Sequence, residues 1–117
     1  MDCIFCKIAN HEIPSNIIAE NDYAIAFEDI APVAPVHIIV VPKIHISNIM
    51  KLNEDNLIYV QEIHKMIQEV AKIKGIDKEE NGFRVITNYG EDGGQTVKHL
   101  HYHVIGGKRL GPKIVHD

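Results

Sequence analysis

Residues 99–105 read His99-Leu100-His101-Tyr102-His103-Val104-Ile105, so three histidines alternate with apolar or aromatic residues. Successive side chains of a β-strand point to opposite faces. If this segment is a strand, the three imidazoles project from one face and the residues between them project from the other. Imidazoles change charge near neutral pH and can act as nucleophile, acid, base or metal ligand. The alternation therefore predicts a functional site on this face, since a solvated row of three histidines without a function is the weakest explanation.

The rest of the chain predicts an α+β fold around this segment. Its 117 residues are typical of one domain, so we expect a single domain over residues 1–117. Alternating or β-branched runs predict four further strands, at residues 17–20, 23–28, 36–41 and 83–88. With residues 99–105 they make a five-stranded, mostly antiparallel sheet.

Two helices are predicted to accompany this sheet. A short one is expected over residues 3–10 at the N-terminus. A long one is expected to be capped by Asn53 and to end at Gly75. Within it an apolar stripe recurs at helical spacing, at Val60, Ile63, Ile67, Val70 and Ile73. This stripe is interpreted as packing against the sheet.

The composition excludes some classes of function. The formal net charge is −4 and no basic stripe occurs, which argues against a nucleic-acid partner. No segment has the length of a membrane span or the pattern of a signal peptide. The two cysteines, Cys3 and Cys6, lie together, so a disulfide framework is not expected and a cytoplasmic location is predicted.

The segment before the histidines is rich in glycine and polar residues. Gly90, Gly93 and Gly94 allow the backbone to approach a ligand closely, and Gln95 and Thr96 add side-chain donors. Such a sequence is also ordinary turn chemistry. Because this segment lies directly before the three histidines, we expect its loop to bind a phosphate group that a histidine of the strand attacks.

Three other positions could carry chemistry. His37 lies at the start of the predicted strand 36–41 and, taken by itself, is best interpreted as a structural histidine. Asp29, in the loop before it, could accept hydrogen bonds from a ribose. Cys3 and Cys6 form a CxxC motif, which indicates zinc or, in a different context, redox chemistry. Two buried structural cysteines are the competing interpretation. A zinc site would need two more ligands, for which His45 and one histidine of the row are candidates.

Together these motifs resemble the histidine triad (HIT) superfamily of nucleotide hydrolases and transferases, whose signature alternates three histidines with hydrophobic residues. The resemblance covers nearly the whole chain and is nearest to the HINT branch. The motifs that carry it are Cys3-Ile4-Phe5-Cys6, Phe27-Glu28-Asp29-Ile30, Ala34-Pro35-Val36-His37, Gly93-Gly94-Gln95-Thr96, residues 99–105, and Gly106-Gly107-Lys108-Arg109.

The resemblance implies a phosphoramidase that acts on purine nucleoside phosphoramidates. His101 would be the nucleophile and form a nucleotidyl-histidine, and its Nδ1–H would need a backbone acceptor. The other catalytic positions implied are His99, His103, Thr96 and His37. The nucleotide would contact Phe5, Phe27, Asp29, Ile30, Asn88, Gly94, Gln95, Thr96, His101 and His103.

The resemblance also implies a metal site and a dimer. Some bacterial relatives bind structural zinc through positions that match Cys3, Cys6, His45 and His99, with no metal required for catalysis. The family is dimeric, so a homodimer is expected here.

Two residues depart from the usual pattern. Tyr102 stands where an aliphatic residue is more common, and Thr96 stands where serine is common. Three alternative functions stay open: a non-catalytic nucleotide-binding or regulatory protein, a dinucleoside polyphosphate hydrolase, and a hydrolase with zinc on the histidine row itself.

Overall fold

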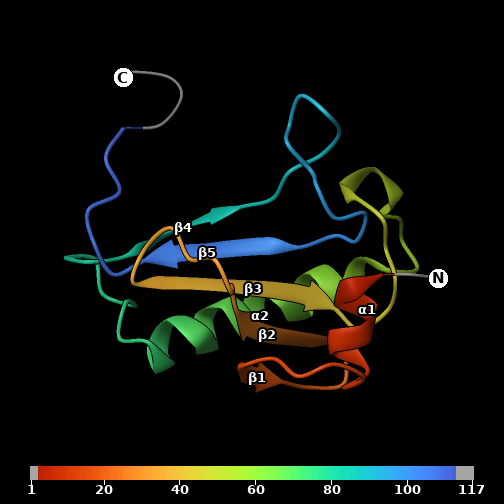
Figure 1. The fold of residues 1–117 in the computed structure, drawn as a ribbon, viewed down its shortest axis with the longest axis horizontal. Helices are drawn as coiled ribbons and strands as arrows, with labels where there is room; N and C mark the ends of the chain where they lie inside the picture. The colour runs from red at the N-terminus through yellow and green to blue at the C-terminus, as the bar shows by residue number, and fades with distance from the viewer. Residues whose placement is uncertain (1–2, 113–117) are drawn as a thin grey trace.

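A five-stranded antiparallel sheet forms the middle layer of the computed structural model, which describes residues 3–112 (Figure 1). The strands are β1 (Ile17–Glu20), β2 (Ala24–Glu28), β3 (Val36–Pro42), β4 (Phe83–Ile86) and β5 (Tyr102–Gly106). Their order across the sheet is β1-β2-β3-β5-β4, and every neighbouring pair is antiparallel. The α+β prediction is confirmed, and this sheet is antiparallel throughout.

The ends of four strands differ from the prediction, β3 only in that it extends one residue further, to Pro42. Strand β5 starts at Tyr102, because the chain before it bonds to loops and not to a neighbouring strand: Leu100 N–H donates to the Ile46 carbonyl at 2.6 Å. Strand β4 ends at Ile86, where its ladder with β5 stops. Strand β2 starts at Ala24, since the N–H groups of Tyr23 and Ala24 both bond to the Asn21 side chain in the preceding turn.

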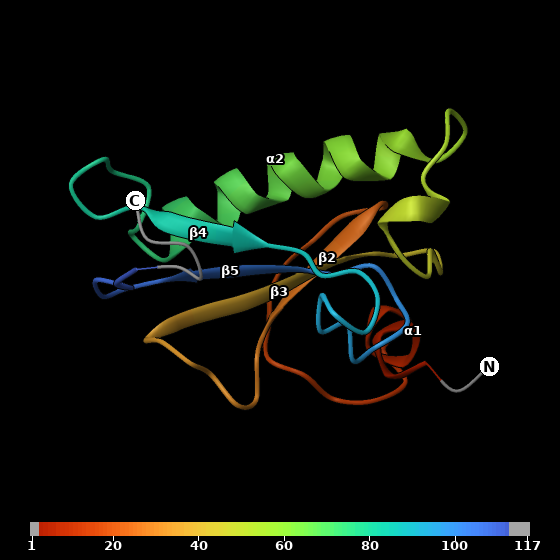
Figure 2. The same ribbon diagram turned by 90° about the horizontal axis from the view of Figure 1, so that it is seen from above.

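The long helix α2 (Leu57–Ile73) covers one face of the sheet (Figure 2). Ile63, Ile67 and Val70 of the predicted stripe are buried in the core, whereas Ile73 in the last turn is 55% exposed. The sheet side of this core includes Leu100, Tyr102 and Val104, the residues that alternate with the histidines. Residues 100, 102 and 104 therefore all face the core, as the alternation predicted, although β5 includes only the last two of them.

The two ends of α2 lie close to the predicted positions. The Asn53 side chain accepts the N–H groups of Asp55 and Asn56, but in a turn that precedes the helix, so α2 starts at Leu57. At the other end Gly75 adopts φ +70°. Ile76 N–H then bonds to the Ala71 carbonyl, as in a common helix-ending motif. A short 3-10 turn, η1 (Ile49–Lys51), lies between β3 and α2 and was not predicted.

The short helix α1 (Ile4–Ala9) lies on the opposite face (Figure 2). Its Phe5, Ile8 and Ala9 pack with Cys3 and with inward residues of β2 and β3. The Cys3 side chain caps the helix by accepting the Cys6 N–H at 3.3 Å. Since α1 is short, it leaves part of this face open. Among the residues described, no helix is long and apolar enough to cross a membrane.

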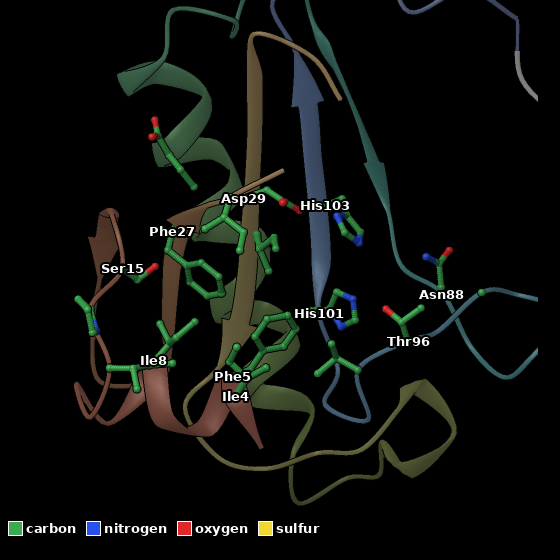
Figure 3. A pocket seen from close by; sticks show the side chains of 17 residues that line it. Ile4, Phe5, Ile8, Ser15, Phe27, Asp29, Asn88, Thr96, His101 and His103 are labelled. Atoms are coloured by element: carbon green, nitrogen blue, oxygen red, sulfur yellow. The ribbon is translucent and has the colours of Figure 1, made fainter. Parts of the chain in front are cut away.

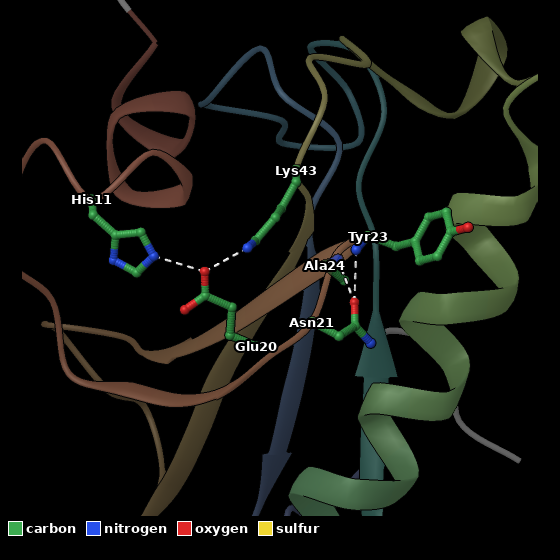
Figure 4. A network of polar contacts seen from close by, with 6 residues as sticks. All are labelled: His11, Glu20, Asn21, Tyr23, Ala24 and Lys43. Carbon is green, nitrogen blue, oxygen red and sulfur yellow. Dashed lines mark hydrogen bonds and ion pairs between the residues drawn. The ribbon is translucent and has the colours of Figure 1, made fainter.

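A polar network holds the C-terminal end of α1 to the sheet (Figure 4). Glu20 Oε2 lies 2.7 Å from His11 Nε2 and 2.5 Å from Lys43 Nζ. Hydrogen bonds from Lys43 and then His11 lower the pKa of Glu20, although burial opposes them. His11 lies two residues beyond the end of the helix with φ 60°, so the chain turns sharply there.

Candidate functional site

A pocket of about 350 Å³ opens on the face that α1 only partly covers. Its two ends differ in chemistry (Figure 3). Asn88, Thr96, His101 and His103 lie along one side, whereas Ile8 and Ser15 lie opposite, with Phe5 and Phe27 between them. Ile13, Ile39 and Val97 add further apolar lining. The pocket therefore suits a ligand with a flat apolar part and an anionic part.

His101 has the tautomer that a nucleophile requires. Its Nδ1 lies 2.7 Å from the His99 carbonyl oxygen. A carbonyl can only accept, so the neutral ring carries its proton on Nδ1 and keeps the lone pair on Nε2. The His101 carbonyl accepts from the Thr87 hydroxyl at 2.8 Å, which fixes the backbone. The Phe5 ring meets the imidazole edge-on, with centroids 4.9 Å apart.

His103 lies at the end of a chain of hydrogen bonds. The Val33 N–H donates to His37 Nδ1 at 3.2 Å, so the neutral His37 ring carries its proton on Nε2. That Nε2–H donates to His103 Nδ1 at 2.9 Å, and Asp29 Oδ2 lies 3.4 Å from the same nitrogen of His37. Neutral His103 then carries its proton on Nε2, at the pocket. Burial, and then the charges of His101 and His37, lower the pKa of His103, while Asp29 raises it.

The loop before the histidines forms one wall of the pocket. Asn88, Gly94 and Thr96 line it. Gln95 was expected to hold phosphoryl oxygens, but it is buried behind the wall, and its amide donates to the carbonyls of Ser47 and Val97. In the structure Gln95 therefore supports the loop and does not line the pocket.

The remaining predicted nucleotide contacts surround the pocket unevenly. Phe5 and Phe27 are buried in its apolar end, with ring centroids 5.6 Å apart. Asp29 lies at the rim, where its Oδ1 accepts the Ala31 N–H at 2.8 Å. Ile30 also lines the pocket but is 98% exposed, so it contributes only an edge.

A second cluster lies beside the pocket. His99 Nδ1 is 3.2 Å from Cys3 Sγ and 3.4 Å from Cys6 Sγ, and His45 Nδ1 is 3.3 Å from Cys6 Sγ. The ring of His99 faces this cluster and not the pocket, so its link to His101 runs through its backbone carbonyl. The structure thus brings all four predicted metal ligands together.

The chemistry of this cluster fits zinc. Burial lowers the pKa of His99 to about 4, and its Nε2–H donates to the Pro42 carbonyl at 3.1 Å. The Nδ1 atom therefore carries a lone pair, which faces the two thiols. Two sulfur and two nitrogen donors suit tetrahedral Zn²⁺, with bonds of about 2.3 Å to sulfur and 2.0–2.1 Å to nitrogen. Burial, with Cys3 nearby, raises the pKa of Cys6 to about 11, so metal binding must displace its proton.

Asp29, His37 and His103 also bring three ligand atoms close together. Here the Val33 N–H occupies His37 Nδ1, so His37 Nε2 keeps its proton and offers no lone pair to a cation. These three residues form a hydrogen-bonded chain rather than a metal site.

Comparison with known proteins shows the family. A family model described as "Scavenger mRNA decapping enzyme C-term binding" matches residues 2–114. The purine nucleoside phosphoramidase of Escherichia coli K12 is 42% identical over 98% of this chain and 95% of its own length. The chain belongs to the histidine triad (HIT) family. This confirms the resemblance drawn from residues 99–105.

Solved HIT structures have the same fold. A histidine triad protein from Clostridium difficile is 53% identical, with a TM-score of 0.91 over 97% of this chain and 96% of its own. A HIT family hydrolase from Clostridium thermocellum is 49% identical, with a TM-score of 0.91 over 97% of each chain.

Several pocket residues of this HIT chain were not predicted. Ile4 and Ile8 belong to α1 beside Phe5, and helical spacing from Phe5 could have indicated Ile8. Ile13, Pro14 and Ser15 come from the loop before β1. No local pattern indicates which residues of an irregular loop face a site, so the sequence held no signal for Ser15.

Proposed function

We propose that this protein hydrolyses the P–N bond of purine nucleoside phosphoramidates. Adenosine 5′-monophosphoramidate and aminoacyl adenylates represent the substrate class, with AMP or GMP and an amine as products. The observation that carries the proposal is His101, whose Nε2 lone pair is available at the polar end of a pocket with an aromatic opposite end. The phosphoramidase from Escherichia coli at 42% identity supports the choice of bond.

The pocket accommodates the three parts of a nucleotide in order. The purine packs against the apolar end that Phe5 and Phe27 line, and the Asp29 carboxylate at the rim accepts from the ribose hydroxyls. The α-phosphate then lies beside His101 and His103. There the Nε2–H of His103 donates to a phosphoryl oxygen and stabilises the charge that develops during attack.

The reaction proceeds in two displacements. His101 Nε2 attacks phosphorus, a P–N bond forms to the imidazole, and the bond to the leaving amine breaks. The leaving nitrogen gains a proton, for which the Thr96 hydroxyl on the pocket wall offers a path from solvent. Water then attacks the nucleotidyl-histidine, releases the nucleotide and restores neutral His101. Covalent catalysis of this kind divides one difficult step into two.

We also propose the setting in which this chemistry occurs. The Cys3, Cys6, His45 and His99 cluster holds a structural zinc ion that takes no part in catalysis. Metal analysis of purified protein tests this: one zinc per chain is expected, with turnover surviving its removal. The enzyme acts in the cytoplasm as a homodimer, and both of its cysteines belong to the metal cluster rather than to a disulfide framework.

The central experiment follows hydrolysis of adenosine 5′-monophosphoramidate. His101→Ala is expected to lower the rate of AMP release by at least about 1,000-fold, because no other group supplies the nucleophile. His64→Ala is the control, since His64 is exposed on α2 and away from the pocket. Circular dichroism checks that both variants fold. Unchanged turnover in His101→Ala would refute the mechanism.

Two further measurements separate the alternatives. Mass spectrometry of acid-quenched enzyme should detect a nucleotidyl group on His101. AMP binding without hydrolysis of any phosphoramidate would instead favour a non-catalytic protein. Faster cleavage of diadenosine polyphosphates than of phosphoramidates would favour the dinucleoside polyphosphate hydrolase.

A further inference from the structure

Helix α1 contributes side chains to both the metal cluster and the pocket. Cys3 caps the helix and Cys6 lies within it, whereas Ile4, Phe5 and Ile8 line the apolar end of the pocket. Phe5 and Cys6 are consecutive residues of this helix and belong to the same hydrogen-bonded turn. A displacement of Cys6 therefore also displaces Phe5.

Phe5 is the side chain through which this link reaches the pocket. Its ring centroid lies 4.9 Å from that of His101, 5.6 Å from Phe27 and 6.0 Å from His99. It packs between the metal cluster on one side and the proposed base site on the other. The apolar surface that Phe5 presents to the pocket therefore depends on where α1 sits.

The other two ligands of the cluster do not belong to α1. His45 follows β3, and His99 lies just before β5. A metal ion bound by all four residues therefore bridges α1 to the sheet. Without the ion, the contacts at this end of α1 are apolar packing and thiol–imidazole pairs of 3.2–3.4 Å, in which a thiol is only a weak donor.

We propose that the cluster, when it holds zinc, positions Phe5 and thereby increases the affinity of the pocket for the nucleobase. The inference rests on the proposed function, because it assumes that a nucleotide occupies the pocket. The phosphate end is not affected in the same way. The loop before the histidines and β5 form that end, and a main-chain carbonyl fixes the tautomer of His101.

The test compares zinc-loaded and zinc-free full-length protein by calorimetric titration. AMP carries the base, whereas ribose 5-phosphate is a matched ligand without it. Removing zinc is expected to weaken AMP binding by about fivefold or more, the lower end of typical coupling between sites. Ribose 5-phosphate should change by less than about twofold on the same scale.

The outcomes distinguish this inference from the proposed function. Equal weakening of both ligands, or of neither, overturns the inference. If AMP binds equally well to both forms and phosphoramidates are hydrolysed, the proposed function stands and the inference alone fails. If AMP binds neither form, both fail.

A set of variants separates positioning from general loosening. His45→Ala removes an exposed ligand that belongs to neither α1 nor the pocket, and should weaken AMP binding even with excess zinc. His45→Cys restores a zinc ligand and should restore AMP affinity. Val70→Ala destabilises the core under α2 instead. If Val70→Ala weakens AMP binding as much as His45→Ala does, the effect is not positioning and the proposal is wrong.

Thermodynamic linkage supplies a second readout. If zinc strengthens AMP binding by some factor, AMP must strengthen zinc binding by the same factor. Competition with a chelator of known affinity measures zinc binding with and without AMP. Equal factors support the proposal, and a zinc affinity that AMP leaves unchanged contradicts it.

Discussion

At the scale of single residues, backbone groups decide what each histidine of the site can do. The His99 carbonyl fixes the proton of His101 on Nδ1, and the Pro42 carbonyl fixes that of His99 on Nε2. The Val33 N–H fixes that of His37 on Nε2. The alternation of residues 99–105 predicted which side chains share a face. The backbone acceptor of His101 was expected from its role as nucleophile and is confirmed. The alternation could not predict which carbonyl it is, nor the tautomers of His99 and His37, because only the fold brings these main-chain atoms near.

The protonation of His103 can be tested by NMR. Because burial lowers its pKa, the His103 titration should have a midpoint below the ordinary value of about 6.5. Asp29 raises this pKa, so Asp29→Asn should lower the midpoint further. Neutral His103 stabilises the fold fully above pH 6.5, and this contribution is lost as the pH falls towards the folded pKa. A midpoint above 6.5 would contradict the burial described here.

Ser15 offers a second test at this scale. Its half-buried hydroxyl faces the apolar end of the pocket and has no partner among the described residues. We expect Ser15→Ala to raise KM for adenosine 5′-monophosphoramidate by about fivefold, the value of one lost hydrogen bond to the base edge. The kcat should stay the same. A fall in kcat with unchanged KM would show that Ser15 acts elsewhere than at the base.

At the scale of elements, periodic segments were predictable and irregular ones were not. The stripe of α2 and the β-branched run of β3 each carry a repeat that matches their geometry, and both lie near the predicted bounds. The late start of β5 depends on where its pairing with β3 and β4 stops, at Val40 and Ile86, although β3 itself continues to Pro42. The CxxC motif of α1 indicated a metal site, whereas the contact of Phe5 with the pocket was expected only from the family resemblance.

The loop between β4 and β5 requires glycine at position 93 for a different reason than at positions 90 and 94. Gly90 and Gly94 have positive φ with open space around them. At Gly93 a Cβ would lie 2.1 Å from the Tyr89 carbonyl oxygen, so the loop must move to accept any side chain.

Gly93→Ala is therefore expected to displace the pocket wall that carries Thr96. The kcat/KM for the phosphoramidate should fall by about tenfold or more, because small displacements at a reacting centre are costly. Glu91→Ala is the control, since Glu91 is exposed in the same loop and its side chain does not line the pocket. A variant with normal kcat/KM would mean that the loop is not required in this shape.

At the scale of the whole molecule, the sheet has an uncovered edge. Strand β4 pairs only with β5 among the described residues, and Phe83, Val85 and Ile86 on it are 37–42% exposed. Exposed apolar edge strands favour pairing with another chain. A second copy presents the same edge, and two antiparallel edges can pair about a two-fold axis.

We therefore expect a dimer that pairs along β4. Val85→Lys places a charge on this edge and should raise the dimer dissociation constant by about tenfold or more, measured by sedimentation velocity. Met50→Lys is the control, because Met50 is 68% exposed on η1. Equal dissociation in both variants would place the interface elsewhere.

The acceptor for the Nδ1–H of His101 belongs to the main chain at position 99. Every amino acid has a carbonyl there, so no substitution at this position deletes that acceptor. During evolution, a lineage could therefore lose the His99 imidazole, and the metal site with it, while retaining a nucleophile with the correct tautomer. Selection on metal binding and selection on bond cleavage can then act separately on one residue.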